Sequence, residues 1–220
     1  MKKIIKAVIP VRAGSQRVKN KNLREFNEKN LLVYKIEKLK KVKGLSGIIV
    51  NTDSEEAIEI AKKYEVNFWK RDGYYASSKC LNSDFWQHIA DTTDSDHIMF
   101  TNSTNPLVKI DTYNSVIEKY NLMKAEFDSI NTVSDEKHFL YLKNKPINFD
   151  PKVAPNSQNL PEIVKLNFAI NIIEKKLMFK KKSVIGENPL FHKLNEIEGV
   201  DIDTMLDFEF AEFLHKKYFR

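Results

Sequence analysis

The sequence has few of the features that mark membrane-spanning, disulfide-bonded or thiolate-metal proteins. Its 220 residues include a single cysteine, Cys80, which excludes an internal disulfide and a thiolate cluster for zinc. No apolar run approaches the roughly 20 residues that a membrane-spanning helix needs. The apolar stretch near the N-terminus is broken by Lys6, Pro10 and Arg12, so it does not resemble a secretory signal peptide. We therefore expect a soluble, cytoplasmic protein without a membrane partner.

The composition is globular, and the charge is unevenly distributed. Hydrophobic residues make up 42% and charged residues 30% of the chain, which predicts one folded domain over residues 1–220. Residues 1–43 hold fourteen Lys and Arg against three Glu, a balance that suits an anionic partner. Nucleic acid is one such partner, but the segment lacks interleaved aromatic residues and any known nucleic-acid-binding motif. The spacing of Lys35, Lys38, Lys40 and Lys41 is also typical of a solvated helix face. We expect a small phosphate ligand rather than nucleic acid.

Hydrophobic patterns predict strands that alternate with helices along the chain. Strands are expected at 4–11, 47–51, 66–69, 97–101, 129–133 and 166–173. Helices are expected at 31–42, 54–64, 85–92, 111–124 and 204–218. This alternation predicts an α/β fold, a doubly wound parallel sheet with helices on both faces. Such sheets bind ligands at the carboxyl ends of their strands, so the loops after Val11, Asn51 and Thr101 are the candidate site.

Residues 134–166 interrupt the alternation. The segment contains four prolines, short β-like pieces and little helical periodicity. Disorder is one interpretation, but Phe139, Tyr141, Phe149 and Leu160 favour packed structure. We expect an excursion from the domain that packs on another subunit.

The loop after the first strand has the residues that bind phosphate. Gly14 permits a tight turn, Ser15 offers a hydroxyl, and the backbone amides can face a phosphate. Arg12 and Lys21 can neutralise its charge. The loop matches neither the P-loop pattern nor G-x-G-x-x-G, which argues against nicotinamide and flavin cofactors. The alternative is a solvated turn.

Asp201 and Asp203 flank Ile202 near the C-terminus. On an extended segment their carboxylates point the same way, as two oxygen ligands for Mg²⁺ would. The alternative is an acidic helix N-terminus in which Asp203 or Thr204 caps the helix that follows. A third group, Asn51 to Asp53 with Arg71 beyond it, can contact a base or ribose, although by itself the pattern favours a plain loop turn.

Together these features resemble the acylneuraminate cytidylyltransferase (CMP-sialic acid synthetase) family. IPVRAGSQRVKNKNL resembles the N-terminal signature of that family, and VDIDTMLDFEFAE resembles its C-terminal I-D-I-D-T-x-x-D motif. Between them, NTD with a later arginine, the Ala-Ser pair at 76–77, NSTNPL, QNLP and NFAINI match weaker motifs in the same order. The resemblance spans nearly the whole chain.

The resemblance implies a mononucleotide-binding fold of the nucleotide-diphospho-sugar transferase type. It implies transfer of CMP from CTP to a small anionic acceptor, Mg²⁺ as cofactor, surface polysaccharide biosynthesis, and a homodimer in which residues 134–166 form the dimerisation excursion. Catalytic roles fall to Arg12, Lys21 and Asp203, and the metal ligands are Asp201 and Asp203. Nucleotide contacts fall to Arg12, Ala13, Gly14, Ser15, Asn22, Asp53, Arg71, Ser77 and Asn102. Acceptor contacts fall to Gln158, Lys165, Asn167 and Asn171.

The chain departs from the family pattern mainly on the acceptor side. Lys165 stands where the family has arginine, Phe168 where it has glycine, and Asn171 where it has tyrosine. A lysine is a point charge and lacks the arginine fork that holds a carboxylate. Two acceptor classes therefore stay open: a sialic, legionaminic or pseudaminic type of 2-keto acid, and a phosphorylated small metabolite. A non-catalytic nucleotide sensor is a further alternative, against which Lys21, Asp201 and Asp203 count.

Overall fold

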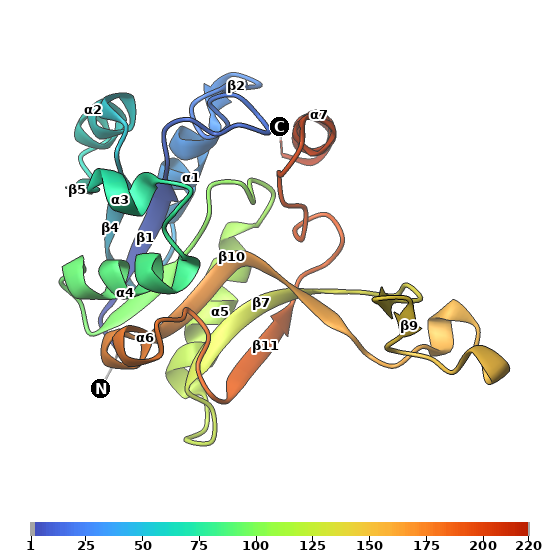
Figure 1. The fold of residues 1–220 in the computed structure, drawn as a ribbon. Helices are drawn as coiled ribbons and strands as arrows, with labels where there is room; N and C mark the ends of the chain where they lie inside the picture. Colours follow the sequence, from blue (N-terminus) through green and yellow to red (C-terminus); the bar gives the residue numbers. More distant parts are fainter. Residues whose placement is uncertain (1–2, 220) are drawn as a thin grey trace.

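The structure is a computed structural model that describes residues 3–219. A mixed seven-stranded sheet forms its centre (Figure 1). Across the sheet the strands lie in the order β11 (Pro189–Lys193), β7 (Ser129–Asp135), β10 (Val164–Glu174), β6 (His97–Phe100), β1 (Ile5–Val11), β4 (Leu45–Thr52) and β5 (Asn67–Lys70). The central strand β1 pairs in parallel with both β4 and β6. The carboxyl ends of these three strands therefore meet at one edge of the sheet.

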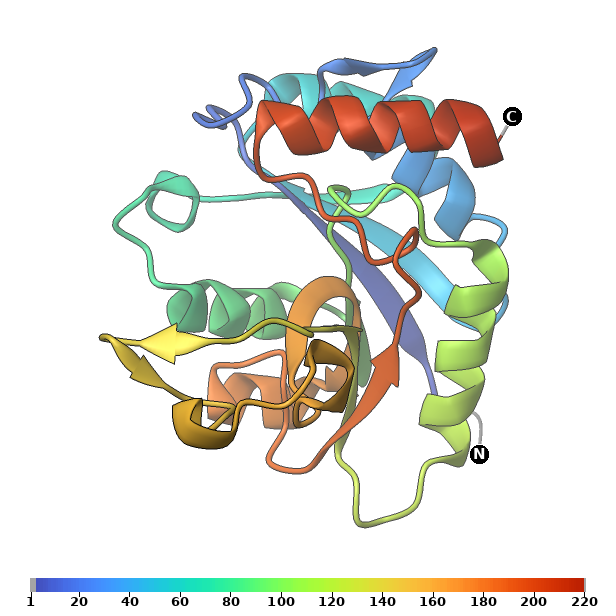
Figure 2. The same cartoon turned by 90° about the vertical axis from the view of Figure 1, so that its right-hand side faces the viewer.

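Helices cover both faces of the sheet, as the sequence predicts (Figures 1 and 2). Ile5, Ala7 and Ile9 of β1 are buried in one core with α1 (Leu31–Leu39), α2 (Glu55–Lys63) and α5 (Ile110–Leu122). Val8 of the same strand lies in a second core with α4 (Asn82–Thr92) and α6 (Lys175–Lys181). Alternate side chains of a strand point to opposite faces, so a strand with buried apolar residues on both faces indicates a sheet covered on both sides. The doubly wound α/β fold is thus confirmed.

One strand of the sheet is antiparallel, which the expected all-parallel sheet did not include. Strand β10 runs antiparallel to both β6 and β7. The reason is its connection: β7 leads out of the sheet at its carboxyl end, and the chain returns from that same side without a crossover helix. A strand that enters from that edge must run the opposite way.

Residues 136–163, here called the arm, project from the body of the molecule (Figure 1). The arm contains β8 (Tyr141–Leu142) and β9 (Lys145–Pro146), which pair as a hairpin, and the 3₁₀ turns η1 (Pro151–Val153) and η2 (Ser157–Asn159). The ring of Phe149 lies 4.8 Å from the Phe139 ring and 5.4 Å from the Tyr141 ring, measured between centroids. These contacts confirm packed structure in the expected excursion rather than disorder.

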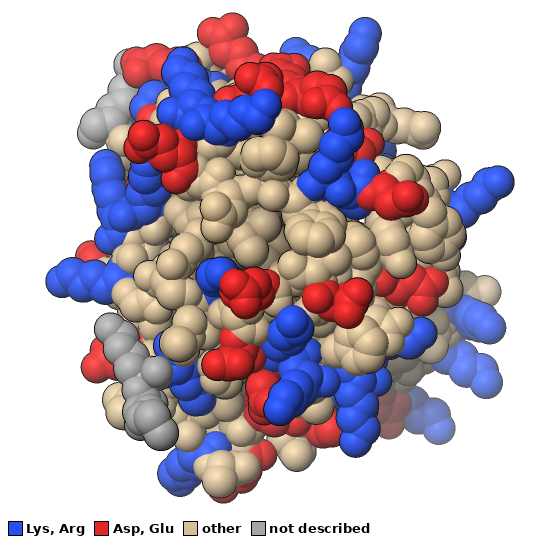
Figure 3. Space-filling view, turned by 90° about the vertical axis from the view of Figure 1, so that its left-hand side faces the viewer, with Lys and Arg blue, Asp and Glu red and all other residues tan. Residues whose placement is uncertain are grey.

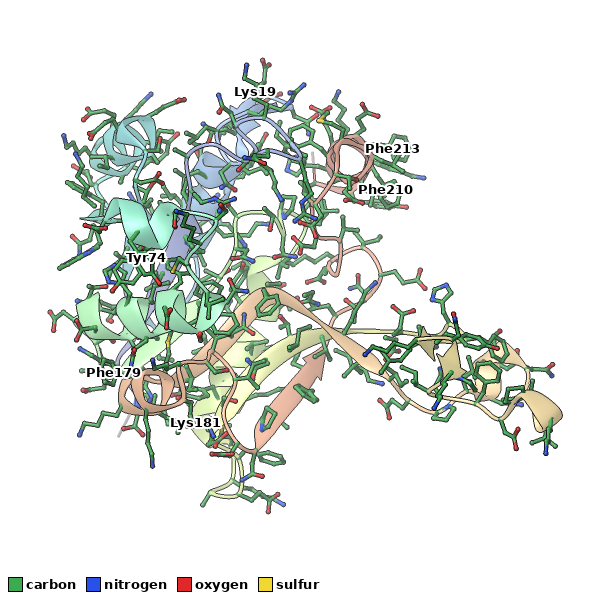
Figure 4. All side chains as sticks on the ribbon, in the orientation of Figure 1. Lys19, Tyr74, Phe179, Lys181, Phe210 and Phe213 are labelled. Carbon is green, nitrogen blue, oxygen red and sulfur yellow. The ribbon has the colours of Figure 1, made fainter. Side chains whose placement is uncertain are left out.

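The C-terminal helix α7 (Met205–Tyr218) packs on a small hairpin of β2 (Glu25–Phe26) and β3 (Lys29–Asn30). Phe208 and Phe26 meet edge to face at 5.4 Å in this third core, which also includes Val18 and Ile202. The third core therefore holds the loop after β1 against the segment that precedes α7. On the outer side of α7, Phe210 and Phe213 project away from the sheet (Figure 4) and are more than half exposed.

The expected strands and helices are all present, with ends that differ by at most three residues. The sequence patterns missed β11, the short strands β2, β3, β8 and β9, the one-turn helix α3 (Gly73–Ala76) and α6. The lysine-rich stretch at 175–182 has a composition typical of solvated surface. It forms α6, whose Met178 is fully buried against α4.

The prediction of a solvated lysine face on the first helix is wrong for Lys35, which is 2% exposed. Lys35 lies on the same side of α1 as Leu31, Leu32 and Leu39, so the fold directs its amine beneath the sheet edge. Lys38 also donates hydrogen bonds to backbone carbonyls of another segment. Two of the fourteen Lys and Arg of residues 1–43 are therefore engaged with the interior of the molecule rather than with solvent.

Charges of both signs are intermixed over the face shown in Figure 3. Among the described residues, no helix is long and apolar enough to cross a membrane.

Candidate active site

A cavity of about 270 Å³ opens at the carboxyl ends of β1, β4 and β6. Its walls come from the loop after β1, the segment between β5 and α4, and the loop after β6. Lys21, predicted to be catalytic, lines it together with six of the nine residues predicted to contact the nucleotide: Arg12, Ser15, Asn22, Arg71, Ser77 and Asn102. The structure thus joins residues from three separate parts of the chain around one space.

The loop after β1 owes its shape to a few local interactions. Gly14 has φ +70°, a conformation that favours glycine, and no atom lies within 4 Å of where a Cβ would stand. The backbone N–H of Ala13 donates to Asp53 Oδ1 at 2.9 Å. Val18 is buried in the third core, whereas Lys19 projects from the tip of the loop (Figure 4). Ala13, Gly14 and Asp53 therefore shape the cavity wall without lining the cavity.

Arg71 holds the ends of two strands together. Its Nε donates to Asn51 Oδ1 at 2.8 Å, and its Nη2 donates to the carbonyl oxygens of Asn51 at 2.6 Å and Val11 at 3.3 Å. The guanidinium lies 4.3 Å from the ring centroid of Phe85. Burial lowers the pKa of Arg71 to about 10, with a smaller contribution from the charge of Arg12. Arg71 is nevertheless cationic at neutral pH, and it lines the cavity with its hydrogen bonds already formed.

The acidic segment 201–203 lies beside the loop after β1. Ile202 is fully buried, and the residues on either side of it are partly or fully accessible. Asp203 pairs with Arg17 at 2.9 Å and with Lys21 at 3.4 Å, and the Lys21 amine also donates to the Ile202 carbonyl at 2.5 Å. A basic loop and an acidic segment that are far apart in the sequence thus meet at one edge of the cavity.

The alternative interpretation of the acidic segment was a helix cap, and the structure gives that role to Thr204. Its hydroxyl accepts from the backbone N–H of Asp207, and Asp207 Oδ2 accepts from the backbone N–H of Thr204 at 2.7 Å. This is a capping box, which satisfies the free N–H groups at the helix start. The Asp203 side chain is therefore not used to cap α7.

Asp201 and Asp203 have the chemistry of a hard-cation site. Oδ1 of Asp201 is buried and has no hydrogen-bond partner, and burial raises the pKa of this carboxyl, as does the charge of Asp203. A cation at this oxygen would satisfy it. Among residues 3–219, no group of three or more His, Cys, Asp or Glu side chains is arranged to hold a metal. Two carboxylates are a donor set that fits Mg²⁺, which binds through one or two carboxylates together with water and substrate phosphates.

The loop after β6 forms the floor of the cavity. Ser103 Oγ donates to Asn22 Oδ1 at 2.7 Å, and the Thr104 carbonyl accepts from the Ile202 N–H at 3.0 Å. The loop therefore contacts both the basic loop and the acidic segment. Sequence analysis selected Asn102 here and missed its two neighbours, although all three belong to the NSTNPL motif.

Other cavity residues were also missed by sequence analysis. Arg17 lies within the basic loop that had been identified, so its charge and position were an available signal. In the wall between β5 and α4, the sequence carried no signal other than the motif matches at Arg71 and Ser77. The missed residues are Pro10, Gln16, Arg17, Tyr75, Cys80, Asn82, Phe85, Ser103 and Thr104. Burial raises the pKa of the Cys80 thiol, which disfavours the reactive thiolate form.

The four predicted acceptor residues do not line the cavity. Gln158 lies on the arm in η2, and Lys165, at the base of the arm, lies 3.7 Å from Glu136 Oε2. Asn167 is 4% exposed and is hydrogen-bonded to Thr132 and Ser134.

Asn171 corrects the sequence prediction. It is fully buried, its Nδ2 donates to the Phe100 carbonyl at 3.3 Å, and its Oδ1 accepts from Asn131 at 2.9 Å. Its position where β10 pairs with both β6 and β7 places the side chain inside the molecule. Asn171 is therefore closed to an acceptor.

Comparison with known proteins finds a family and several relatives with cytidylyltransferase names. Residues 6–193 match the family model described as Cytidylyltransferase. The N-acylneuraminate cytidylyltransferase of Escherichia coli O18:K1:H7 is 26% identical over 99% of this chain and 53% of its own length. The CMP-N,N'-diacetyllegionaminic acid synthase of Campylobacter jejuni serotype O:2 is 26% identical over 96% of this chain and 94% of its own.

Among solved structures, a CMP:2-keto-3-deoxy-manno-octonic acid synthetase complexed with CTP superposes with a TM-score of 0.70. The match covers 97% of this chain and 99% of that structure, at 13% sequence identity. The two proteins therefore share a fold.

Proposed function

This chain belongs to the cytidylyltransferase family, and we propose that it transfers CMP from CTP to a nine-carbon 2-keto acid and releases pyrophosphate. The observation that carries the proposal is the contact of Lys21 and Arg17 with Asp203 at the edge of the cavity. It brings a cationic phosphate-binding loop against a pair of carboxylates suited to Mg²⁺. The relatives named above act on sialic and legionaminic acids, which are acceptors of this class.

The chain's own residues bind and orient the reacting groups. An oxygen of the acceptor attacks the α-phosphorus, a new oxygen–phosphorus bond forms, and the bond to the β-phosphate oxygen breaks. Arg12 and Lys21 place positive charge where the phosphates and the departing pyrophosphate carry negative charge. Asp203 is our candidate acceptor for the proton of the attacking hydroxyl. Mg²⁺ held by Asp201 and Asp203 would supply further neutralisation of the phosphate charge when bound.

We further propose that the enzyme is a homodimer and acts in the cytoplasm, where nucleoside triphosphates are made. The arm supports a dimer because it carries apolar side chains into solvent. The side chains of Tyr141, Leu142, Ile147 and Val153 are 56% to 74% exposed. In a dimer, Gln158 and Lys165 of one subunit would contribute acceptor contacts to the other.

A second acceptor class is favoured by Phe168. Its ring packs against Trp86, with centroids 6.2 Å apart, and its carbonyl accepts from the Asn102 N–H at 3.4 Å. Phe168 stands where the family pattern has glycine, and Lys165 lacks the arginine fork that holds a carboxylate, so a phosphorylated small metabolite is our second candidate acceptor.

The test is pyrophosphate release from CTP and Mg²⁺ with two sets of acceptors: nine-carbon 2-keto acids, and small phosphorylated metabolites including amino-acid phosphates. Release with a keto acid is the expected result. Release only with a phosphorylated compound would assign the second class. CTP binding without release for either set would instead identify a nucleotide sensor.

The Asp203→Asn variant tests the acidic segment. We expect turnover to fall on the order of a hundredfold, because a Mg²⁺ ligand and the candidate proton acceptor are lost together. Asp111→Asn, at the start of α5 and away from the cavity, is the matched control and should keep full turnover. Unchanged turnover in Asp203→Asn would remove Asp203 from both metal binding and proton transfer.

A further inference from the structure

Two lysine amines of α1 lie directly beneath the loop after β6. The Lys35 amine donates to Tyr113 OH at 2.6 Å, to Thr101 Oγ1 at 3.3 Å and to the Asn105 carbonyl at 3.3 Å. All of its hydrogen-bond partners are uncharged. A buried ammonium among neutral groups is costly, and burial lowers the pKa of Lys35 well below its ordinary value.

The partners of Lys35 bracket the part of the loop that lines the cavity. Thr101 precedes and Asn105 follows the three residues Asn102 to Thr104, which form the cavity floor. Thr101 Oγ1 also donates to the Ala169 carbonyl at 2.6 Å, so one end of the bracket is fixed to β10. The Lys35 amine therefore links the two ends of segment 101–105 through hydrogen bonds from one nitrogen atom.

Lys38, about one turn further along α1, holds the next part of the same loop. Its amine donates to the Pro106 carbonyl at 2.6 Å and to the Val108 carbonyl at 2.5 Å. A lysine ammonium has three donors on one atom, so it can gather several carbonyls at a point where no strand continues. The loop has no regular secondary structure over 101–109, and these two amines supply bonds that a strand or helix would otherwise supply.

The same loop is hydrogen-bonded to the segment that contains Asp201 and Asp203. The Ile202 N–H donates to the Thr104 carbonyl at 3.0 Å, and Asn105 Nδ2 donates to the Val200 carbonyl at 3.4 Å. Both bonds involve the part of the loop that Lys35 closes. A displacement of this part would therefore move the segment that carries the carboxylates.

We propose that Lys35 is a positioning residue for the nucleotide site: it holds residues 101–105 in the shape that forms the cavity floor and, through them, sets the position of segment 200–203. Lys38 is the second support of the same loop. This inference rests on the proposed function for its consequence in CTP binding. This role explains why an amine is buried at a position where an apolar side chain would have a smaller desolvation cost.

The test compares Lys35→Met with Lys40→Met. Methionine has similar length and no donor, so it removes the bonds and keeps the volume. Lys40, at the end of α1, donates to the Tyr64 carbonyl and does not contact the loop, which makes it the matched control. Two quantities are measured in each variant: amide hydrogen exchange of the protein without ligand, and CTP affinity by calorimetry with and without Mg²⁺.

In Lys35→Met we expect faster exchange at residues 101–105 and 200–203, with exchange in β1 and β4 unchanged. CTP should bind about tenfold more weakly. This fold-change corresponds to the net free energy of about one hydrogen bond that no longer orders the loop. Lys40→Met should match the wild type in both measurements. A uniform rise of exchange over the whole chain, or unchanged exchange at the loop, would overturn the proposal and leave Lys35 as a packing residue.

If Lys35→Met does not fold, Lys38→Met decides. It should give faster exchange at 105–108 and a smaller loss of CTP affinity, and wild-type behaviour in both would contradict the proposal. The exchange measurement needs no nucleotide. Failure of the wild type to bind CTP would therefore count against the proposed function, and the exchange pattern would still test the role of Lys35.

Discussion

Phe168 shows at the scale of one residue how this chain differs from the pattern that it resembles. It has φ +52°, in the left-handed region that favours glycine, and it lies where the pairing of β10 with β7 shifts register between Leu166 and Asn171. The ring packs against Trp86 and joins the second core. The packing of the Phe168 ring between the sheet and α4 offsets the free-energy cost of the left-handed backbone conformation.

The two contributions at Phe168 can be separated by substitution. We expect Phe168→Gly to be more stable than Phe168→Ala by about 1 kcal/mol, because both lose the ring but only glycine avoids the left-handed penalty. Free energies of unfolding from urea titration measure this difference.

Phe191 on β11 is the matched control for this comparison. It is 46% exposed and its φ is not positive, so there the alanine variant should be the more stable of the two. The same order at both positions would show that backbone strain at Phe168 is negligible.

At the scale of the element, the start of α7 separates two roles that the sequence alone left open. Thr204 and Asp207 form the capping box, and the Asp203 carboxylate, one residue earlier, faces Arg17 and Lys21. Asp207 Oδ2 also accepts from the Asp203 N–H at 3.1 Å. The cap therefore fixes the backbone from which the Asp203 carboxylate projects.

Loss of the cap should affect both stability and the site. We expect Thr204→Ala to lower the free energy of unfolding by about 1 kcal/mol, the usual contribution of such a cap. It should also raise the Mg²⁺ concentration needed for half-maximal activity, because the Asp203 backbone loses its support.

Thr204→Ser keeps the hydroxyl and should restore both quantities. If Thr204→Ala loses stability but keeps the wild-type Mg²⁺ dependence, the cap supports the helix only and does not position Asp203.

At the scale of the whole molecule, the arm leaves apolar surface that one copy of the chain does not cover. Its hairpin exposes Leu142 by 62%, and η1 exposes Val153 by 74%. The arm also carries Gln158, which the chain's own cavity does not reach. The proposed dimer explains both features, since a partner would cover the hairpin and receive the glutamine.

A charge on the hairpin tests the dimer. We expect Leu142→Glu to dissociate the protein into monomers, because a carboxylate cannot be buried in an apolar interface without a large desolvation cost. Sedimentation velocity gives the oligomeric state, and pyrophosphate release should fall with it. Leu122→Glu, at the end of α5 with 75% exposure, is the control and should leave the assembly unchanged.

A monomeric wild type at micromolar concentration would refute the dimer. A dimeric Leu142→Glu would instead move the interface away from the hairpin.

The sequence by itself determined the doubly wound α/β fold and the edge of the sheet at which the site lies. Both follow from local causes: apolar residues with period two or near 3.6 form buried strands and helices, and parallel strands gather their loops at one edge. The turn at Gly14, the cation Lys21 and the carboxylate pair at 201 and 203 could likewise be identified from the sequence, because each is recognisable in a pattern of a few neighbouring residues.

Only the tertiary structure decided where the remaining polar side chains point. The spacing of Lys35 from Leu31 and Leu39 puts it on the buried side of α1, but the loop after β6 that accepts its hydrogen bonds is distant in the sequence. Asn171 became internal because β10 pairs on both sides, and the antiparallel direction of β10 follows from the arm. Such outcomes depend on contacts between distant segments, and hydrophobic periodicity along one segment does not encode them.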